Sequence, residues 1–336
     1  MDKLILLDNS TRNKLISKRS GESKFGQHVK LLSGISNIYE QLLNLDVEYV
    51  IFGIQEDIGV FANYGNPGTS KAWDATLKIL LNIQSNQYTK AKKVLVLGHL
   101  DFGEELEEVS KFNSKDRNHI KRARQLVKSI DKHVAFLVNI IVSAGKKPII
   151  VGGGHNNAYG NIKGTALALN ETVSAINLDA HSDFRPEEGR HSGNGFSYAY
   201  AEGFLNKYFV FGLHENYTSE KTISTLNLVK AVKFNTFESI EIRREKKFRK
   251  EMETALSHIS KGAFGIEIDC DAITNVPSSA MTPSGFSVKK ARKFVNFFGA
   301  HDNAKYLHIC EASPKKKSKK QIGKLITYLI IDFIKA

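Results

Sequence analysis

Short runs of apolar and β-branched residues recur along the chain, and segments with helical spacing of apolar positions separate several of them. Runs of this length and composition predict buried β-strands. The predicted strands are residues 48–52, 94–97, 148–151, 175–178, 208–211, 231–234, 264–268 and 306–309. Because parallel strands are joined by crossover helices, the alternation predicts an α/β fold with helices on both faces of a parallel sheet.

The clearest helical pattern covers residues 120–144 and ends at Gly145, which is a common helix stop. Its apolar positions are Val127, Ile130, Val134, Leu137, Val138 and Ile141. Further helices are predicted at residues 70–83, 248–260, 288–298 and 321–334. The chain contains no Pro/Gly/Ser-rich linker, low-complexity segment or internal repeat, so we expect one domain over residues 1–336.

Two polar clusters follow predicted strands. The first reads Asp179-Ala-His181-Ser-Asp183 and the second reads Asp269-Cys-Asp271. In each cluster the acidic or imidazole side chains occupy every second position. Alternate side chains of an extended backbone point the same way, so each cluster should direct its ligands into one small volume.

Two more polar residues also follow predicted strands. His155 comes after a Gly152-Gly153-Gly154 turn behind the strand at 148–151, and Glu311 follows the strand at 306–309. Open parallel sheets bind their ligands at the carboxyl ends of the strands. We therefore expect these residues and the two clusters to converge in space although they lie far apart in the sequence.

Each motif has a simpler explanation when it is taken alone. The cluster at 179–183 could cap a helix, the one at 269–271 could start a solvated loop, and His155 could be structural. A cap needs one polar group, however, and not three alternating ones. Together the motifs offer six nitrogen and oxygen donors without a thiolate, which suits two hard or borderline divalent cations that share carboxylates.

The chain has 336 residues and a formal net charge of +13, which raises the question of an anionic partner. Basic residues are spread widely, with local runs at 243–250 and 315–320. Apart from Phe248, no aromatic residue interleaves with these runs, and no nucleic-acid motif accompanies them. We interpret the runs as solvated surface and expect no nucleic-acid partner.

The two cysteines, Cys270 and Cys310, lie at predicted strand ends, where small buried thiols are expected. A disulfide framework is excluded in practice, which favours a reducing compartment and a cytoplasmic protein. The first residues do not resemble a secretory signal. The longest apolar stretch, residues 325–334, is too short to span a bilayer and contains Asp332, so we expect a core helix and no membrane association.

The order of Gly152–His155, Asp179–Asp183 and Asp269–Asp271 resembles the ureohydrolase superfamily of arginases, agmatinases and formimidoylglutamases. Further segments extend the resemblance over most of the chain, namely residues 53–57, 66–68, 97–101 and 310–314. The resemblance implies a single ureohydrolase domain with a three-layer α/β/α sandwich on an eight-stranded, mainly parallel sheet. It also implies two Mn²⁺ ions per subunit.

By resemblance, each manganese ion would have four protein ligands, two of them shared. The first ion would be held by His155, Asp179, Asp183 and Asp269. The second would be held by Asp179, His181, Asp269 and Asp271. Glu267 falls on the same alternation as Asp269, but it lies deeper in the strand and we do not expect it to coordinate. Arginases commonly have a small polar residue there, and the role of Glu267 is left open.

Such a site would perform hydrolysis, because two cations lower the pKa of a bridging water and supply hydroxide at neutral pH. The hydroxide would attack the planar carbon of an amidine or guanidine, and the leaving amine must then be protonated. We expect Asp271 to relay that proton. Glu311 is expected to face the cationic nitrogen end of the substrate, although it could instead cap a helix.

Two departures from arginases bear on the substrate. Arginases carry a proton-shuttle histidine after a Ser-Gly-Asn, whereas here Ser192-Gly193-Asn194 is followed by Gly195-Phe196-Ser197, and neither His191 nor His214 fills that position. Arginases also place an asparagine where Arg185 falls. Arg185 could bind a substrate carboxylate with both arms of its guanidinium, or it could be a salt-bridged surface residue.

The segment from Asp179 to Arg185, with residues 211–216 and 323–328, is similar to formimidoylglutamases, which hydrolyse N-formimino-L-glutamate to L-glutamate and formamide in histidine degradation. We therefore predict a manganese-dependent hydrolase of a small anionic amidine. The alternatives are a ureohydrolase acting on arginine, agmatine or another guanidino acid, and a non-catalytic metal-binding member of the family. The sequence leaves open the metal's identity, the reason for the lysine run at 315–320, and whether the protein forms a homo-oligomer.

Overall fold

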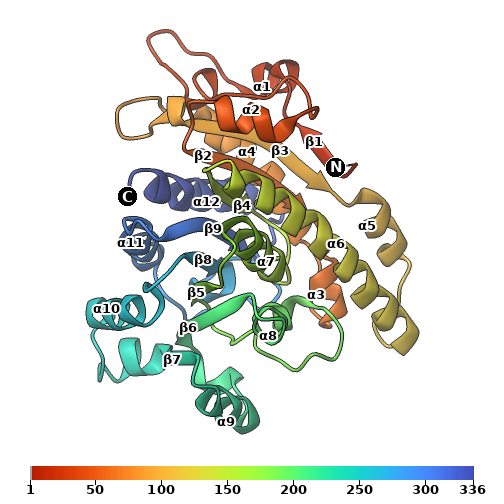
Figure 1. The fold of residues 1–336 in the computed structure, drawn as a ribbon, viewed down its shortest axis with the longest axis vertical. Helices are drawn as coiled ribbons and strands as arrows, with labels where there is room; N and C mark the ends of the chain where they lie inside the picture. Colours follow the sequence, from red (N-terminus) through yellow and green to blue (C-terminus); the bar gives the residue numbers. More distant parts are fainter. Residues whose placement is uncertain (1) are drawn as a thin grey trace.

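A nine-stranded sheet runs through the centre of the computed structural model, which describes residues 2–336 (Figure 1). Its strands are β1 (Leu4–Leu6), β2 (Tyr49–Gln55), β3 (Val94–Asp101), β4 (Lys147–Val151), β5 (Val173–Leu178), β6 (Leu205–Leu213), β7 (Val232–Thr236), β8 (Phe264–Asp269) and β9 (Ala304–Cys310). Their order across the sheet is β1-β3-β2-β4-β9-β8-β5-β6-β7. All neighbours are parallel except β1 and β3.

All eight predicted strands are present, as β2 to β9, but the predicted total of eight strands is one short. The missing strand is β1, which adds antiparallel to the edge strand β3 with Leu4 opposite Leu100 and Leu6 opposite Gly98. Three residues are too few to establish a period of two, and Ile5 between them is 48% exposed. The chain therefore gave no periodic signal for this strand.

Twelve α-helices accompany the sheet in the described part of the chain. They are α1 (Asn9–Leu15), α2 (Ile38–Asn44), α3 (Ile58–Ala62), α4 (Ala72–Asn82), α5 (Gly103–Ser110), α6 (Arg117–Ser143), α7 (Asn157–Leu169), α8 (Gly195–Ala201), α9 (Glu220–Leu228), α10 (Phe248–Ile259), α11 (Val288–Gly299) and α12 (Lys319–Ile334). The five predicted helices correspond to α4, α6, α10, α11 and α12.

Helices cover both faces of the sheet and complete the three-layer sandwich expected from the sequence (Figure 1). Helices α4, α10, α11 and α12 share one buried apolar cluster with the sheet. Helices α2, α6, α7 and α8 share the other cluster on the opposite face. Burial of these two apolar faces is the main force that holds the layers together.

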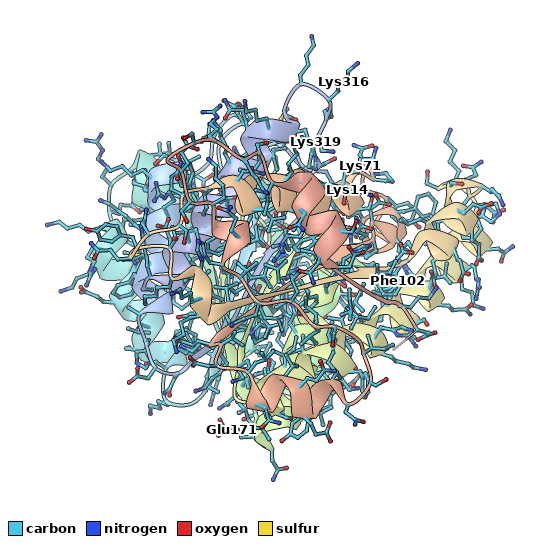
Figure 2. All side chains as sticks on the ribbon, turned by 90° about the horizontal axis from the view of Figure 1, so that it is seen from above. Lys14, Lys71, Phe102, Glu171, Lys316 and Lys319 are labelled. Carbon is cyan, nitrogen blue, oxygen red and sulfur yellow. The ribbon has the colours of Figure 1, made fainter. Side chains whose placement is uncertain are left out.

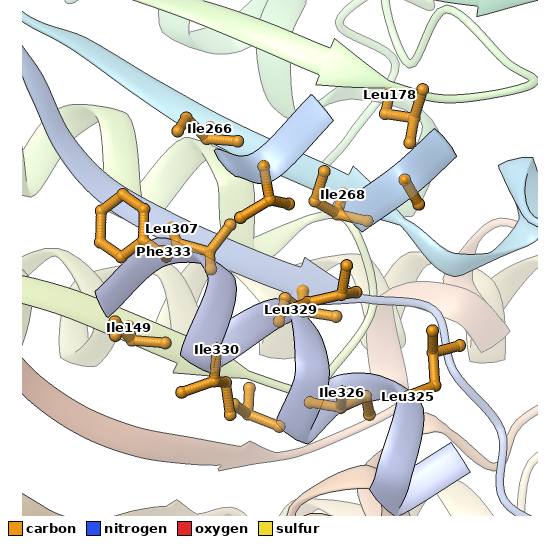
Figure 3. Close-up of a cluster of buried hydrophobic side chains, with 14 of the residues drawn as sticks. Ile149, Leu178, Ile266, Ile268, Leu307, Leu325, Ile326, Leu329, Ile330 and Phe333 are labelled. Atoms are coloured by element: carbon orange, nitrogen blue, oxygen red, sulfur yellow. The ribbon is translucent and has the colours of Figure 1, made fainter. Parts of the chain in front are cut away.

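The C-terminal helix α12 illustrates this packing. Figure 3 shows Ile326, Leu329 and Ile330 of α12 in the same apolar cluster as Ile149 and Leu307 of the central strands, and all five are fully buried. Helix α12 can approach α4 closely only because residue 323 is a glycine. A Cβ at this position would lie 2.1 Å from the carbonyl oxygen of Ala75. The expectation of a core helix at 325–334 is confirmed, and no described helix is both long and apolar enough to cross a membrane.

Charged residues lie mainly outside this core. The lysines of the 315–320 run are exposed just before and at the start of α12, and Figure 2 shows Lys316 pointing away from the body of the protein. Cys270 and Cys310 are buried free thiols, as expected.

Candidate metal centre

The four central strands β4, β9, β8 and β5 lie side by side and end at the same edge of the sheet. His155 follows β4 after the glycine turn, and Glu311 follows β9 directly. Asp269 is the last residue of β8, and Asp179 follows β5 directly. The predicted convergence of distant polar residues therefore results from the order of the strands.

The first group of potential ligands surrounds Nδ1 of His155. This nitrogen lies 3.3 Å from Oδ2 of Asp179, 2.8 Å from Oδ2 of Asp183 and 3.2 Å from Oδ2 of Asp269. The ligand atoms of these four residues all lie within 4.8 Å of one another. They are the four residues that the family resemblance assigned to the first ion.

A second group consists of Asp179, His181 and Asp271. Nδ1 of His181 lies 3.0 Å from Oδ2 of Asp271 and 3.6 Å from Oδ1 of Asp179. Asp179 thus turns one oxygen toward each group, as a bridging carboxylate would. Asp269, the other expected bridge, belongs only to the first group, and its Oδ1 accepts a hydrogen bond of 2.8 Å from the backbone N–H of Asp271.

Neighbouring groups fix the orientation of Asp179. Its Oδ2 accepts a hydrogen bond of 2.8 Å from the side-chain amide of Asn177, and its Oδ1 accepts one of 2.6 Å from the backbone N–H of His181. Asn177 lies two residues earlier on β5 and therefore on the same side of the sheet. A carboxylate held in this way keeps its oxygens directed at both groups before any ion binds.

Glu56 holds the turn that carries His155. This carboxylate is fully buried and accepts hydrogen bonds from the backbone N–H of Gly154 at 2.8 Å, and from the side-chain amide of Asn157 at 2.7 Å. Gly153 has a positive φ of 76°, and a Cβ there would lie 2.4 Å from the Asn157 amide nitrogen. The glycine turn therefore belongs to the construction of the site and is more than a loose connection.

Four carboxylates and two imidazoles crowd this small volume, and their pKa values reflect the crowding. Burial, with the charge of Asp179, raises the pKa of Asp183 to about 6. Burial and the charges of Asp271 and Asp179 raise the pKa of Asp269 well above its usual value. Burial opposes ionisation of Asp179 as well, but His155 and His181 lower its pKa.

The donor set fits a pair of divalent cations. Bound cations would offset the repulsion among the carboxylates, and oxygen with imidazole nitrogen is the ligand chemistry of hard or borderline metals. Oδ1 of Asp271 is buried and has no hydrogen-bond partner within residues 2–336. A carboxylate oxygen that is free at this position can bind a cation or accept and pass on a proton.

The centre opens into a cavity of about 320 Å³. Among its lining residues are His181, Asp183, Arg185, Asp269, Asp271 and Glu311 from the predicted set, together with Asn63, Tyr217 and Ser279. The last three were missed, because they lie in connections whose course the alternation of apolar and polar residues does not determine. A molecule in this cavity would meet the ligand groups on one side and a polar wall on the other.

Glu311 and Arg185 both line the cavity, as expected for residues that contact a substrate. Burial raises the pKa of Glu311 to about 8, and its oxygens accept hydrogen bonds from the His155 backbone N–H at 2.9 Å and the Ser279 hydroxyl at 3.0 Å. Arg185 donates to Oδ1 of Asn63 at 2.7 Å and to Oε1 of Glu188 at 3.1 Å. Arg185 is therefore salt-bridged and also faces the cavity.

Neither of the other candidate histidines replaces the missing shuttle. His191 is fully buried, and burial together with the charges of nearby arginines lowers its pKa to about 3. His214 is stacked between Tyr217 and Phe237, and burial lowers its pKa. Neither is among the residues that line the cavity.

Comparison with known proteins agrees with this geometry. A sequence model described as the Arginase family matches residues 47–334, which is most of the chain. The chain belongs to the arginase family. A formimidoylglutamase of Streptococcus gordonii is 25% identical over 319 residues, which cover 92% of this chain and 89% of that relative.

Solved structures of low sequence identity share the fold. The crystal structure of formimidoylglutamase from Bacillus subtilis aligns with a TM-score of 0.76 at 17% identity, covering 95% of this chain and 93% of that one. A crystal structure of Trypanosoma cruzi formiminoglutamase with Mn²⁺ aligns with a TM-score of 0.69 at 19% identity, covering 87% and 96%. The arginase-like fold expected from the sequence is thus confirmed.

Proposed function

We propose that this member of the arginase family is a manganese-dependent hydrolase of a linear amidine, and that its substrate is N-formimino-L-glutamate. The products would be L-glutamate and formamide. The observation that carries the proposal is the arrangement of six ligands at the sheet edge, which opens into a cavity with Arg185 in its wall. The relatives named formimidoylglutamase support this choice of substrate.

Two Mn²⁺ ions per subunit would occupy the centre. His155, Asp179, Asp183 and Asp269 would hold the first ion, and Asp179, His181 and Asp271 the second. Asp269 would be a second shared ligand by family resemblance alone. A bound pair of divalent cations lowers the pKa of a water and supplies hydroxide at neutral pH.

The residues of the chain would place the substrate and move one proton. Glu311 would accept hydrogen bonds from the formimino nitrogen, and Arg185 would bind a carboxylate of the glutamate part. Addition of hydroxide to the formimino carbon is followed by cleavage of its bond to the glutamate nitrogen, which leaves as an amine after taking up a proton. Asp271 is the proposed carrier of that proton, because its Oδ1 is buried near the cavity and has no other partner among the described residues.

A substrate panel tests this function directly. We expect the Mn²⁺-loaded protein to release formamide from N-formimino-L-glutamate and to release little or no urea from arginine, agmatine or guanidino acids. Release of urea from one of the guanidino compounds, with no formamide, would instead identify another ureohydrolase. A protein that binds two ions and hydrolyses none of these compounds would be a non-catalytic member of the family.

A matched pair of variants connects activity with the metal. Asp269→Asn should abolish turnover and lower the manganese content, because it changes a ligand of the first ion. Asp101→Asn is the control, since Asp101 also ends a strand of the sheet but belongs to neither ligand group. The control should keep both activity and metal, and full activity of Asp269→Asn after chelation and dialysis would contradict the assignment.

We also propose a reducing compartment such as the cytoplasm. Cys270 and Cys310 are buried free thiols, and no disulfide is present within residues 2–336. Free thiols are typical of proteins in reducing compartments.

A further inference from the structure

One ring nitrogen of His155 makes no hydrogen bond to any of residues 2–336. Nδ1 faces the carboxylates of the first ligand group, whereas Nε2 points into the protein, is fully buried and has no hydrogen-bond partner among the described residues. An unpaired polar atom in this position costs free energy. The carboxylate oxygen that faces Nε2 is Oε2 of Glu267, at 3.6 Å.

Glu267 is itself held in a fixed position. It is paired in register with His308 of β9, so both side chains point to the same side of the sheet. Nδ1 of His308 lies 2.5 Å from Oε2 of Glu267, and the Tyr306 hydroxyl donates to Oε1 at 2.8 Å. All three side chains are fully buried, so the carboxylate cannot turn away into solvent.

The same network reaches the turn that carries His155. Nε2 of His308 lies 3.4 Å from the carbonyl oxygen of Gly152. Glu267 therefore lies behind the imidazole of His155, and its partner His308 contacts the start of the turn. Glu267 belongs to none of the groups of potential metal ligands in the described structure, although it shares the alternation of Asp269. His308 does belong to a third such group, with His155 and the buried thiol of Cys310.

We propose that Glu267, fixed by His308 and Tyr306, is a positioning residue that accepts a hydrogen bond from the Nε2–H of His155 and thereby fixes the metal-binding tautomer of that histidine. This inference rests on the proposed function, because it assigns Nδ1 to the first ion. Histidine ligands in proteins almost always donate their other ring N–H to such an acceptor, which sets ring orientation and raises ligand basicity.

The two ions should depend unequally on this network. The imidazole of His155 is fully buried against Glu267, while the imidazole of His181 in the second group is 33% exposed. Loss of the Glu267 carboxylate should therefore weaken binding of the first ion, which His155 would hold, and leave binding of the second ion unchanged.

Manganese titration of the metal-free protein tests the inference without any substrate. We expect wild type to bind two ions per chain and Glu267→Gln to bind one of them about 10- to 100-fold more weakly. Electron paramagnetic resonance gives a second readout at limiting Mn²⁺. Wild type should give the spectrum of a coupled pair of ions, and Glu267→Gln should give that of a single ion.

Tyr306→Phe is the matched control, because it removes a hydrogen bond to Oε1 of Glu267 but leaves Oε2 and His308 in place. This variant should weaken binding of the first ion much less than Glu267→Gln does, because the oxygen that faces Nε2 of His155 and its contact with His308 remain. Equal weakening in Tyr306→Phe and Glu267→Gln would mean that any disturbance of this core loosens the site, and would overturn the specific role of Glu267. Unchanged affinity in Glu267→Gln would overturn it as well.

If Glu267→Gln does not fold, the double variant Glu267→Gln/His308→Gln replaces both members of this buried pair by neutral amides. It should show the same selective loss of one ion, and retention of both ions would again overturn the inference. The result is independent of the proposed substrate. A wild-type protein that binds two ions but does not release formamide would refute the substrate and leave the role of Glu267 standing.

Discussion

Asp179 shows how much a single residue contributes to this site. Its two oxygens face different imidazoles, His155 and His181, and each oxygen also accepts a hydrogen bond from a neighbouring group. This division is possible because Asp179 directly follows β5, where its backbone is still fixed by the sheet. The carboxylate can therefore link two cations without first having to be ordered.

Arg185 provides a prediction at the same scale. Arg185→Ala should raise KM for N-formimino-L-glutamate by about tenfold or more, because a charge-assisted hydrogen bond contributes about 1.5–3 kcal/mol. Steady-state kinetics with the Mn²⁺-loaded protein measures the change.

Arg122→Ala is the control for Arg185→Ala. Arg122 is also an arginine paired with a glutamate, Glu108, but it does not line the cavity. Its removal should leave KM unchanged. If Arg185→Ala also leaves KM unchanged, the arginine does not bind a substrate carboxylate.

The convergence of the candidate ligand residues could be predicted because each ends or follows a central strand. The extended backbone expected for the two clusters is wrong, since Cys270–Ala272 form a 3-10 helix and Asp183 has a φ of 43°. Of the cavity wall, Arg185 and Glu311 could be predicted, but Asn63, Tyr217 and Ser279 could not, since they lie in connections between elements.

The network of side chains behind His155 could be predicted in part. Tyr306 and His308 occupy alternate positions of a predicted strand, so they were expected on one side of the sheet. Their contact with Glu267 requires β8 and β9 to be neighbours, and local sequence patterns do not predict the order of strands.

At the scale of elements, the strands were easier to predict than the helices. Buried parallel strands form largely apolar runs, and β2 and β4 are clear examples. The edge strand β7 is less apolar and carries the exposed Lys233. Helix α7, by contrast, was missed because it is buried on several sides, and its buried residues include Asn157, Asn161 and Thr165. A helix of this kind shows no apolar stripe against a polar one, so its period is hidden.

The short helical turn Ser192–Asn194 leads to a prediction about pH. His191 caps it, since Nδ1 accepts a hydrogen bond of 3.1 Å from the backbone N–H of Gly193. Burial, with the charges of Arg185, Arg124 and Arg190, lowers the pKa of His191 to about 3. In the unfolded chain the imidazole takes up a proton near pH 6.5, so this residue's contribution to stability is lost as pH falls from about 6.5 to about 3.

Replacing His191 by asparagine should flatten this dependence. The variant keeps a side-chain acceptor for the cap but does not titrate, so its free energy of unfolding should fall less steeply, by about 1 kcal/mol per pH unit below 6.5. Denaturant unfolding of both metal-free proteins between pH 7 and pH 4.5 measures the two slopes. Equal slopes would show that protonation of His191 does not contribute to acid destabilisation.

For the whole molecule, metal binding and stability should be linked. The candidate ligand residues follow or end β4, β5 and β8, so they come together only in the folded chain. A ligand that binds only the folded state stabilises it by about 2.7 kcal/mol at 100 times its dissociation constant. Removal of manganese by chelation should therefore lower the melting temperature by several degrees.

Thermal unfolding with and without added Mn²⁺ checks this linkage. Wild type should gain stability as the concentration of the ion rises, whereas Asp269→Asn should gain much less. A wild-type melting temperature that does not respond to Mn²⁺ would mean that the centre does not bind the ion in the folded protein.

The order of the strands also has a consequence for the growing chain. Strands β9 and β8, the last two to be synthesised, lie between β4 and β5, which are made much earlier. His155 and Asp179 therefore stay apart by the width of two missing strands until the end of translation approaches. A nascent polypeptide would present only scattered weak ligands to cellular metals, and the manganese pair would be captured as one of the final events of folding.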